Sequence, residues 1–220
     1  MSEWWTYRLS SFLLFSPRAY WRLHELYNVD VWPLQVAGLG IGLAIVVLAR
    51  HRRPWAARSA LLLLAACWIW VAWAYLLRRY ATINWAATYF AAAFVIEALL
   101  LAAIALSGRM RVAPAASLQQ RIGLGVAVFA LVAQPALGRA TGRALGELEF
   151  FGVAPDPTAV ATMGVVLLAG RRAPWGLLVV PLLWCAVSGA LQWGLGSWDA
   201  LALPLAGVLV VTSRWVGRPR

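Results

Sequence analysis

The chain has 220 residues, of which 63% are hydrophobic and only 12% are charged. Soluble domains are roughly half apolar and about a quarter charged, so this composition excludes an ordinary soluble protein. The net charge of +11 comes from 19 arginines, with no lysine. These arginines cluster at the ends of long apolar runs, where the orientation signals and anchors of membrane proteins lie. We therefore expect this basic chain to partner the lipid bilayer and not a nucleic acid.

The apolar residues fall in blocks of span length, which predicts an all-α, polytopic transmembrane helix bundle. We expect about seven spans, or six if one of the shorter runs does not cross. The predicted spans are residues 32–49, 55–77, 83–106, 122–137, 157–170, 176–195 and 200–211. The chain thus divides into an amphipathic interfacial segment (1–31), a single transmembrane helical domain (32–213) and a short basic tail (214–220).

The N-terminal segment contains an amphipathic helix rather than a span. Ser16-Pro17 is typical of a helix start, with Ser as the N-cap and Pro at the first helical position. Arg18 and Arg22 share one face of this helix, and aromatic residues crowd the other. Such a helix lies in the membrane interface or packs as a lid on the bundle, and both alternatives stay open. His24 has no second His or Cys nearby, so we interpret it as an interfacial aromatic residue rather than a ligand.

Two patterns inside the predicted spans point to packing. Gly38 and Gly42 form a GxxxG pair in the first span, which allows another helix to approach closely. Cys67 and Cys185 each lie within an apolar run, so we expect two buried, free thiols that act as small packing residues.

The chain around the fifth span is less regular. Residues 138–156 carry recurring glycines and two acids, and we expect a surface helix or a poorly ordered loop there. Asp156-Pro157-Thr158 is typical of a helix start with an acidic cap, and the helix ends near Gly170. Fourteen residues reach about 21 Å, whereas the hydrocarbon core is about 30 Å thick. Either this helix begins inside the membrane, or the Phe-rich segment before it completes the crossing.

Glu97 is the first candidate for a functional residue, because it is the one acid well inside a predicted span. An ionisable group at that depth is costly and marks a polar pathway by default. The functional interpretation is a carboxyl that handles protons or cations in the bundle interior. The structural alternative is a protonated or hydrogen-bonded side chain that fixes helix packing. Asn84, Gln134 and Gln192 are its candidate partners if the helices pack suitably.

Asp156 is the second candidate, because a helix N-terminus at membrane depth combines free N–H groups with the positive end of the helix dipole. As a cap, Asp156 already uses that field and needs no further function. The predicted binding residues are thus Glu97, Asn84, Gln134, Asp156 and Gln192. We predict no catalytic residue, metal site or cofactor, since the sequence contains no nucleophile elbow, zinc-protease motif or phosphate-binding loop.

The arginine distribution predicts an orientation. With seven spans, twelve arginines lie on the side of the C-terminus and seven on the side of the N-terminal helix. Positively charged residues favour the cytoplasmic side. We therefore expect a cytoplasmic C-terminus and an external N-terminal helix.

Several motifs together resemble an uncharacterised family of small bacterial multi-span membrane proteins, a domain of unknown function. They are Tyr27-Asn28, Val31-Trp32-Pro33-Leu34-Gln35, Trp68-Ile69-Trp70, Ala74-Tyr75, Ile83-Asn84, Tyr89-Phe90, Phe151-Gly152-Val153, Pro155-Asp156-Pro157-Thr158 and Pro181-Leu182-Leu183-Trp184 with Gly189. The resemblance covers nearly the whole chain and implies a bacterial inner-membrane location without a known activity. In the family pattern Cys often stands at the position of Asp156, and this departure counts against a metal or redox role.

Two functions follow as expectations. The first is transport of a small solute, a proton or a cation by a small bundle, with Glu97 in a polar interior. The second is a non-catalytic accessory or assembly subunit, which binds a membrane protein partner or a second copy of the chain. A polar cavity around Glu97 would favour transport, and a sealed, packed position would favour the accessory subunit.

Overall fold

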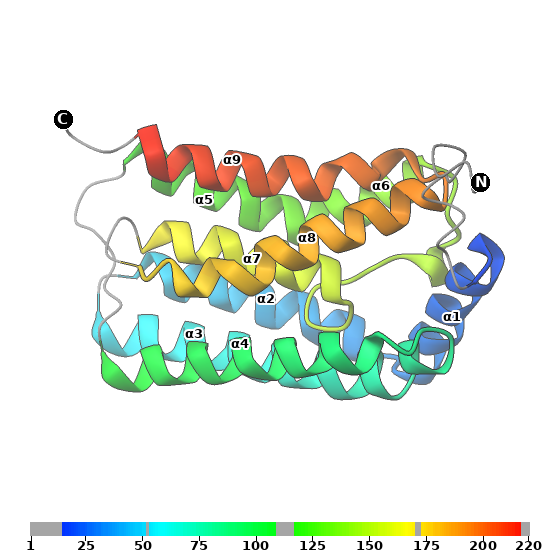
Figure 1. The fold of residues 1–220 in the computed structure, drawn as a ribbon. Helices are drawn as coiled ribbons and strands as arrows, with labels where there is room; N and C mark the ends of the chain where they lie inside the picture. Colours follow the sequence, from blue (N-terminus) through cyan, green and yellow to red (C-terminus); the bar gives the residue numbers. More distant parts are fainter. Residues whose placement is uncertain (1–14, 52, 109–116, 170–172, 217–220) are drawn as a thin grey trace, which may run out of the picture.

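The computed structural model describes residues 15–51, 53–108, 117–169 and 173–216. Within these ranges the protein is an all-α bundle (Figure 1), and this confirms the predicted fold class. The α-helices are α1 (Pro17–Asp30), α2 (Leu34–Arg50), α3 (Pro54–Trp70), α4 (Ala87–Ser107), α5 (Leu118–Val128), α6 (Gln134–Ala140), α7 (Pro155–Leu168), α8 (Gly176–Gly194) and α9 (Ala202–Val216). The short helices η3 (Val71–Leu77), η4 (Tyr80–Thr82), η5 (Phe129–Ala133), η6 (Leu145–Glu147) and η8 (Trp198–Leu201) extend or connect them.

The number of full-length spans is smaller than the seven predicted. Four continuous helices in the described part are long and apolar enough to cross a membrane, namely 54–82, 87–107, 118–140 and 176–194. A fifth is counted if α1 and α2, which meet at an angle of 86°, form one bent span. Taken alone, α2, α7 and α9 have 17, 14 and 15 residues, below the length of about 20 that a bilayer requires.

α1 packs across one end of the bundle and forms a lid there (Figure 1). Ser16 caps it as predicted, accepting a hydrogen bond from the Ala19 N–H at 3.2 Å. One face is buried against the bundle, where Tyr27 donates to the Val153 carbonyl at 3.0 Å. Asn28 donates to the carbonyls of Gly146 and Leu148 at 2.7 and 2.8 Å. The lid therefore holds the chain segment that leads into α7.

That segment corrects the expectation of a surface helix or poorly ordered loop at 138–156. From η6 it runs back into the bundle and turns near the middle, where α7 begins (Figure 1). Phe151 and Val153 are only 2% and 1% exposed. Both alternatives for the short fifth span thus hold together, because α7 starts inside the bundle and the Phe-rich segment covers the remaining depth. We call residues 147–154 the re-entrant segment.

The predicted GxxxG pair on α2 does permit a close approach. The re-entrant segment meets it at both glycines, and η5 also meets it at Gly42, where a Cβ would collide with Leu131 Cδ2. A side chain at Gly38 would collide with the Phe151 carbonyl oxygen. A Cβ at Gly42 would lie 2.9 Å from the ring atom Cδ1 of Phe151. Gly152 follows with a φ of 73°, a left-handed conformation that glycine adopts without strain. These glycines therefore make room for the turn that starts α7.

α7 is the central helix, and every residue from Pro155 to Leu168 is buried. Its closest neighbour is α5, and the two helices meet at Gly123 and Gly164. A Cβ at Gly164 would lie 2.6 Å from the Ala127 amide nitrogen, and one at Gly123 would lie 2.8 Å from the Gly164 carbonyl oxygen. Such small residues let two membrane helices approach closely. Cys67 and Cys185 are buried and free, as predicted.

We predict that Gly164→Leu destabilises the protein by more than the 1–3 kcal/mol or so typical of overpacking, because backbone atoms of α5 would have to move. Gly125→Ala on the same pair of helices is the matched control, since no atom lies within 4 Å of a Cβ there. The control should be neutral or stabilising, as Ala forms helices better than Gly. Thermal unfolding in detergent, followed by circular dichroism, measures both. Equal unfolding temperatures for the two variants would contradict the close α5–α7 contact.

Candidate functional site

The start of α7 holds Asp156 in a fully buried position, 0% exposed. Three side chains of α8 donate hydrogen bonds to its carboxylate. The Trp184 indole N–H reaches Oδ1 at 2.7 Å, while the Ser188 hydroxyl and the Gln192 amide reach Oδ2 at 2.9 and 2.5 Å. These donors are spaced four residues apart and so share one face of α8. Ser188 lies six residues before Gly194, so the site is about 9 Å from that end of α8.

Asp156 is not the helix cap that its sequence context predicts. Ala154 is the N-cap residue and makes no side-chain capping bond, while Pro155 occupies the first helical turn with Asp156. Neither Pro155 nor Pro157 has a backbone N–H, so this helix end offers few donors to an anion. The positive end of the helix dipole still favours a carboxylate. The helix start therefore stabilises its own carboxyl and does not form an anion-binding site.

A chain of buried polar groups leads from Asp156 toward the lid. Gln192 accepts a hydrogen bond from Arg143 Nη2 at 3.2 Å, so its amide links the carboxylate to the guanidinium. Arg143 also donates to Asp199 at 2.7 Å and lies 3.7 Å from Glu149. Glu149 in turn lies 3.4 Å from His24 Nε2 on α1. The polar chain is thus continuous between the middle of the bundle and its lid.

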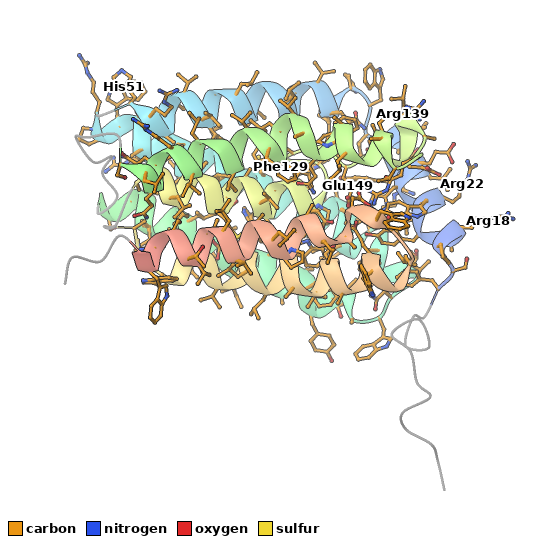
Figure 2. All side chains as sticks on the ribbon, turned by 90° about the horizontal axis from the view of Figure 1, so that it is seen from above. Arg18, Arg22, His51, Phe129, Arg139 and Glu149 are labelled. Carbon is orange, nitrogen blue, oxygen red and sulfur yellow. The ribbon has the colours of Figure 1, made fainter. Side chains whose placement is uncertain are left out.

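The lid seals this polar chain from the surrounding medium. The guanidinium of Arg143 packs on the Trp21 ring, with Cζ 3.8 Å from the ring centroid. His24 is 1% exposed, and its Nε2 lies 2.9 Å from the Tyr75 hydroxyl. Figure 2 places Glu149 inside the outline of the bundle, whereas Arg22 of α1 lies at its end. His24 is therefore part of a buried polar cluster, which corrects its interpretation as an interfacial aromatic residue.

Tyr20 is the aromatic neighbour of this cluster on α1. Its ring centroid lies 4.6 Å from that of His24. Burial, followed by the charge on nearby groups such as Glu149, raises the pKa of the Tyr20 phenol well above its usual value. The phenol is thus neutral at physiological pH.

Asp156 can hold a proton or release it while its two carboxyl oxygens keep their hydrogen bonds to α8. As a carboxylate, Asp156 accepts all three α8 donors. As an acid, it can donate from Oδ2 to the Ser188 oxygen, because a hydroxyl rotates and both donates and accepts. The formal charges point the same way, since within the described ranges the Arg143 guanidinium contacts Glu149 and Asp199 and is linked through Gln192 to a third carboxyl, Asp156. A proton or another cation would reduce this excess of negative charge.

The other predicted site residues are not brought together. Glu97 is 0% exposed, and neither carboxylate oxygen has a hydrogen-bond partner among the described residues. Asn84 accepts from the Ala86 N–H within its own turn, and the buried Gln134 Oε1 has no partner in the same ranges. Gln192, the third expected partner of Glu97, bonds to Asp156 instead. The predicted cluster around Glu97 is therefore wrong, and the pair that forms is Asp156 with Gln192.

Sequence reasoning missed most of the residues that surround Asp156. Ser188 and Gln192, four residues apart on an apolar helix, were the available signal for a polar face. Arg143 and Glu149 gave no such signal, because they belong to an irregular stretch whose path only tertiary packing defines. No group of three or more His, Cys, Asp or Glu side chains in the described ranges is arranged to hold a metal ion.

The described part of the chain is an all-α bundle with four helices, or five with the bent pair, that are long and apolar enough to cross a membrane, as in a polytopic membrane protein. The chain belongs to DUF6064, a family of unknown function, whose model matches residues 17–216. This confirms the predicted family resemblance over nearly the whole chain. No curated protein and no solved structure matches the chain.

We predict that Trp184→Phe lowers the free energy of unfolding by about 1.5–3 kcal/mol, the range for a hydrogen bond to a charged group. The ring still fills its place, but the buried carboxylate loses one donor. Trp193→Phe is the matched control on the same helix, because Trp193 is 56% exposed. Thermal and denaturant unfolding of both variants in detergent measures the difference. A loss of equal size in the two variants would argue against a stabilising Trp184–Asp156 bond.

Proposed function

We propose that the protein handles protons or cations in membrane transport, with Asp156 as the carboxyl that binds and releases them. The observation that carries this proposal is a buried carboxyl where a short helix begins inside the bundle. Interrupted helices of this kind form the central sites of many transporters, where side chains and helix ends meet coupling ions. Buried ionisable residues inside membrane segments commonly mark such pathways.

The polar chain supplies the second argument for transport. A structural carboxyl needs donors only in its immediate surroundings, and the three α8 side chains already provide them. Yet the polar chain continues from Asp156 through Gln192 and Arg143 to Glu149 and His24, close to the end of the bundle. In our proposal, movement of the α1 lid exposes this polar route, and Asp156 exchanges its proton or cation there. The proposal needs no covalent chemistry, and we do not assign the protein to an enzyme class.

The setting that we propose is a bacterial inner membrane, with the chain as a multi-pass protein. α1 lies at one end of the bundle and the last turn of α9 at the other (Figure 1). If the seven predicted segments each cross, twelve arginines lie on the side of the C-terminus and seven on the other, and the positive-inside rule then favours a cytoplasmic C-terminus. Asp156 would then exchange with the external side through the lid.

A non-catalytic accessory or assembly subunit is the second candidate function. Glu97 favours it, because this fully buried carboxyl has no hydrogen-bond partner in the described ranges. A sealed acid of this kind is expected to serve packing or assembly rather than transport. The partner in that case would be another membrane protein or a second copy of the chain.

The proposal is tested by flux into proteoliposomes that contain a pH-sensitive dye, with sodium and potassium gradients as parallel arms. We expect the wild type to dissipate a proton or cation gradient and Asp156→Asn to abolish this flux, because an amide cannot take up and release the ion. Glu97→Gln is the matched control, a carboxyl-to-amide change at a second buried site outside the polar chain. It should keep the wild-type flux.

The two candidate functions give different results in this experiment. Loss of flux in Glu97→Gln but not in Asp156→Asn would identify Glu97, and not Asp156, as the carboxyl that binds the ion. No flux by the wild type for a proton or either cation, with both variants folded by circular dichroism, would contradict transport and favour the accessory subunit.

A further inference from the structure

A groove lies on the outside of the lid, between α1 and the turn that follows η3. Its cavity volume is about 360 Å³. Arg22, Arg78 and Arg79 supply guanidinium groups, and Leu23, Leu26 and Ile83 supply apolar surface. The α1 residues that line it are spaced at i, i+3 and i+4, so they share the face of the helix that turns toward η4. The groove thus combines a positively charged part with an apolar part.

The positive charge in the groove exceeds what its neighbouring acids neutralise. Arg22 pairs with Glu25 at 2.6 Å, and Arg79 pairs with Asp30. Arg78 lies over the Trp73 ring, with Cζ 5.1 Å from the centroid, and no carboxylate partners it in the described ranges. The two ion pairs are partly exposed, and exposed pairs of this kind contribute little stability. An incoming anion could therefore engage all three arginines.

The surroundings of the groove place it at the level of lipid headgroups. Trp85 and Tyr89, on the same end of the bundle at the start of α4, are 69% and 68% exposed and stack edge to face at 5.9 Å. Trp73, beneath Arg78, is 48% exposed. Exposed Trp and Tyr side chains gather at the boundary between hydrocarbon and headgroups. A groove beside them meets phosphate groups on one side and the first carbons of acyl chains on the other.

We propose that this groove binds the phosphate group of an anionic phospholipid, with Arg22, Arg78 and Arg79 on the phosphate. Guanidinium groups suit this role, because their planar donors match phosphate oxygens in paired hydrogen bonds. Leu23, Leu26 and Ile83 contact the lipid where its acyl chains begin. A zwitterionic headgroup fits less well, because its own cation would meet the arginines. The bound lipid bridges α1 to the η3–η4 turn and so holds the lid closed.

The test measures lipid binding to the purified full chain, and it does not depend on transport. Native mass spectrometry and thermal unfolding compare phosphatidylglycerol with phosphatidylcholine, with inorganic phosphate as a separate arm. We expect phosphatidylglycerol to bind and raise the unfolding temperature of the wild type. Arg78→Gln should weaken that binding roughly fivefold, and Arg22→Gln/Arg78→Gln should weaken it further, as expected for arginines near an anionic surface.

The matched control is Arg18→Gln, which removes the same charge from an exposed position of α1 outside the groove. It should bind phosphatidylglycerol like the wild type. Arg78→Gln breaks no ion pair to a described acid, so a fold-neutral variant is available, and circular dichroism verifies it. Equal weakening in Arg18→Gln and Arg78→Gln, or no preference for phosphatidylglycerol in the wild type, would overturn the proposal. Inorganic phosphate that reproduces the stabilisation would overturn the lipid assignment in favour of a soluble phosphate ligand.

Discussion

The close approach of the Phe151 backbone to Gly38 is the constraint on which the rest of the structure depends. A side chain at Gly38 would occupy the place of the Phe151 carbonyl, so only a glycine lets the re-entrant segment enter between the helices. That entry moves the start of α7 from the surface to the middle of the bundle (Figure 1). It also buries the backbone of the segment, whose carbonyls then need donors. Tyr27 and Asn28 of α1 supply them, which ties the lid to the helix start.

Asp156 is buried as a consequence of this path. Its burial explains why the face of α8 that turns toward α7 carries polar side chains. A carboxylate inside a membrane bundle is costly unless it is hydrogen-bonded, and Trp184, Ser188 and Gln192 meet that need. The guanidinium of Arg143 then contacts Gln192 and Asp199. The lid, the re-entrant segment and α8 therefore form one polar unit inside an apolar bundle. A change in the protonation of this polar unit would therefore affect the lid, the re-entrant segment and α8 together.

The sequence predicted the all-α class, the approximate positions of the long apolar helices and the family resemblance, because these depend on local sequence patterns. Apolar runs end at arginines and prolines, and Ser16 caps α1 where its motif indicated. The sequence did not predict the arrangement of the site, and the reason is physical. Depth along a span made Glu97 the strongest candidate, but depth does not reveal which side chains face an acid. Glu97 has no hydrogen-bond partner among the described residues, whereas Asp156, interpreted as a cap, has three donors.

Hydrophobicity and helix-start signals are properties of neighbouring residues, so the sequence by itself determined that this is a bundle of apolar helices in the DUF6064 family. It also identified Gly38 and Gly42 as a place of close approach. Only the tertiary structure decided what approaches there, because the re-entrant segment lies more than a hundred residues further along the chain. The same long-range packing placed Arg143, Glu149 and His24 in one cluster. Burial and hydrogen bonding are set by contacts between distant segments, and these contacts moved the candidate site from Glu97 to Asp156.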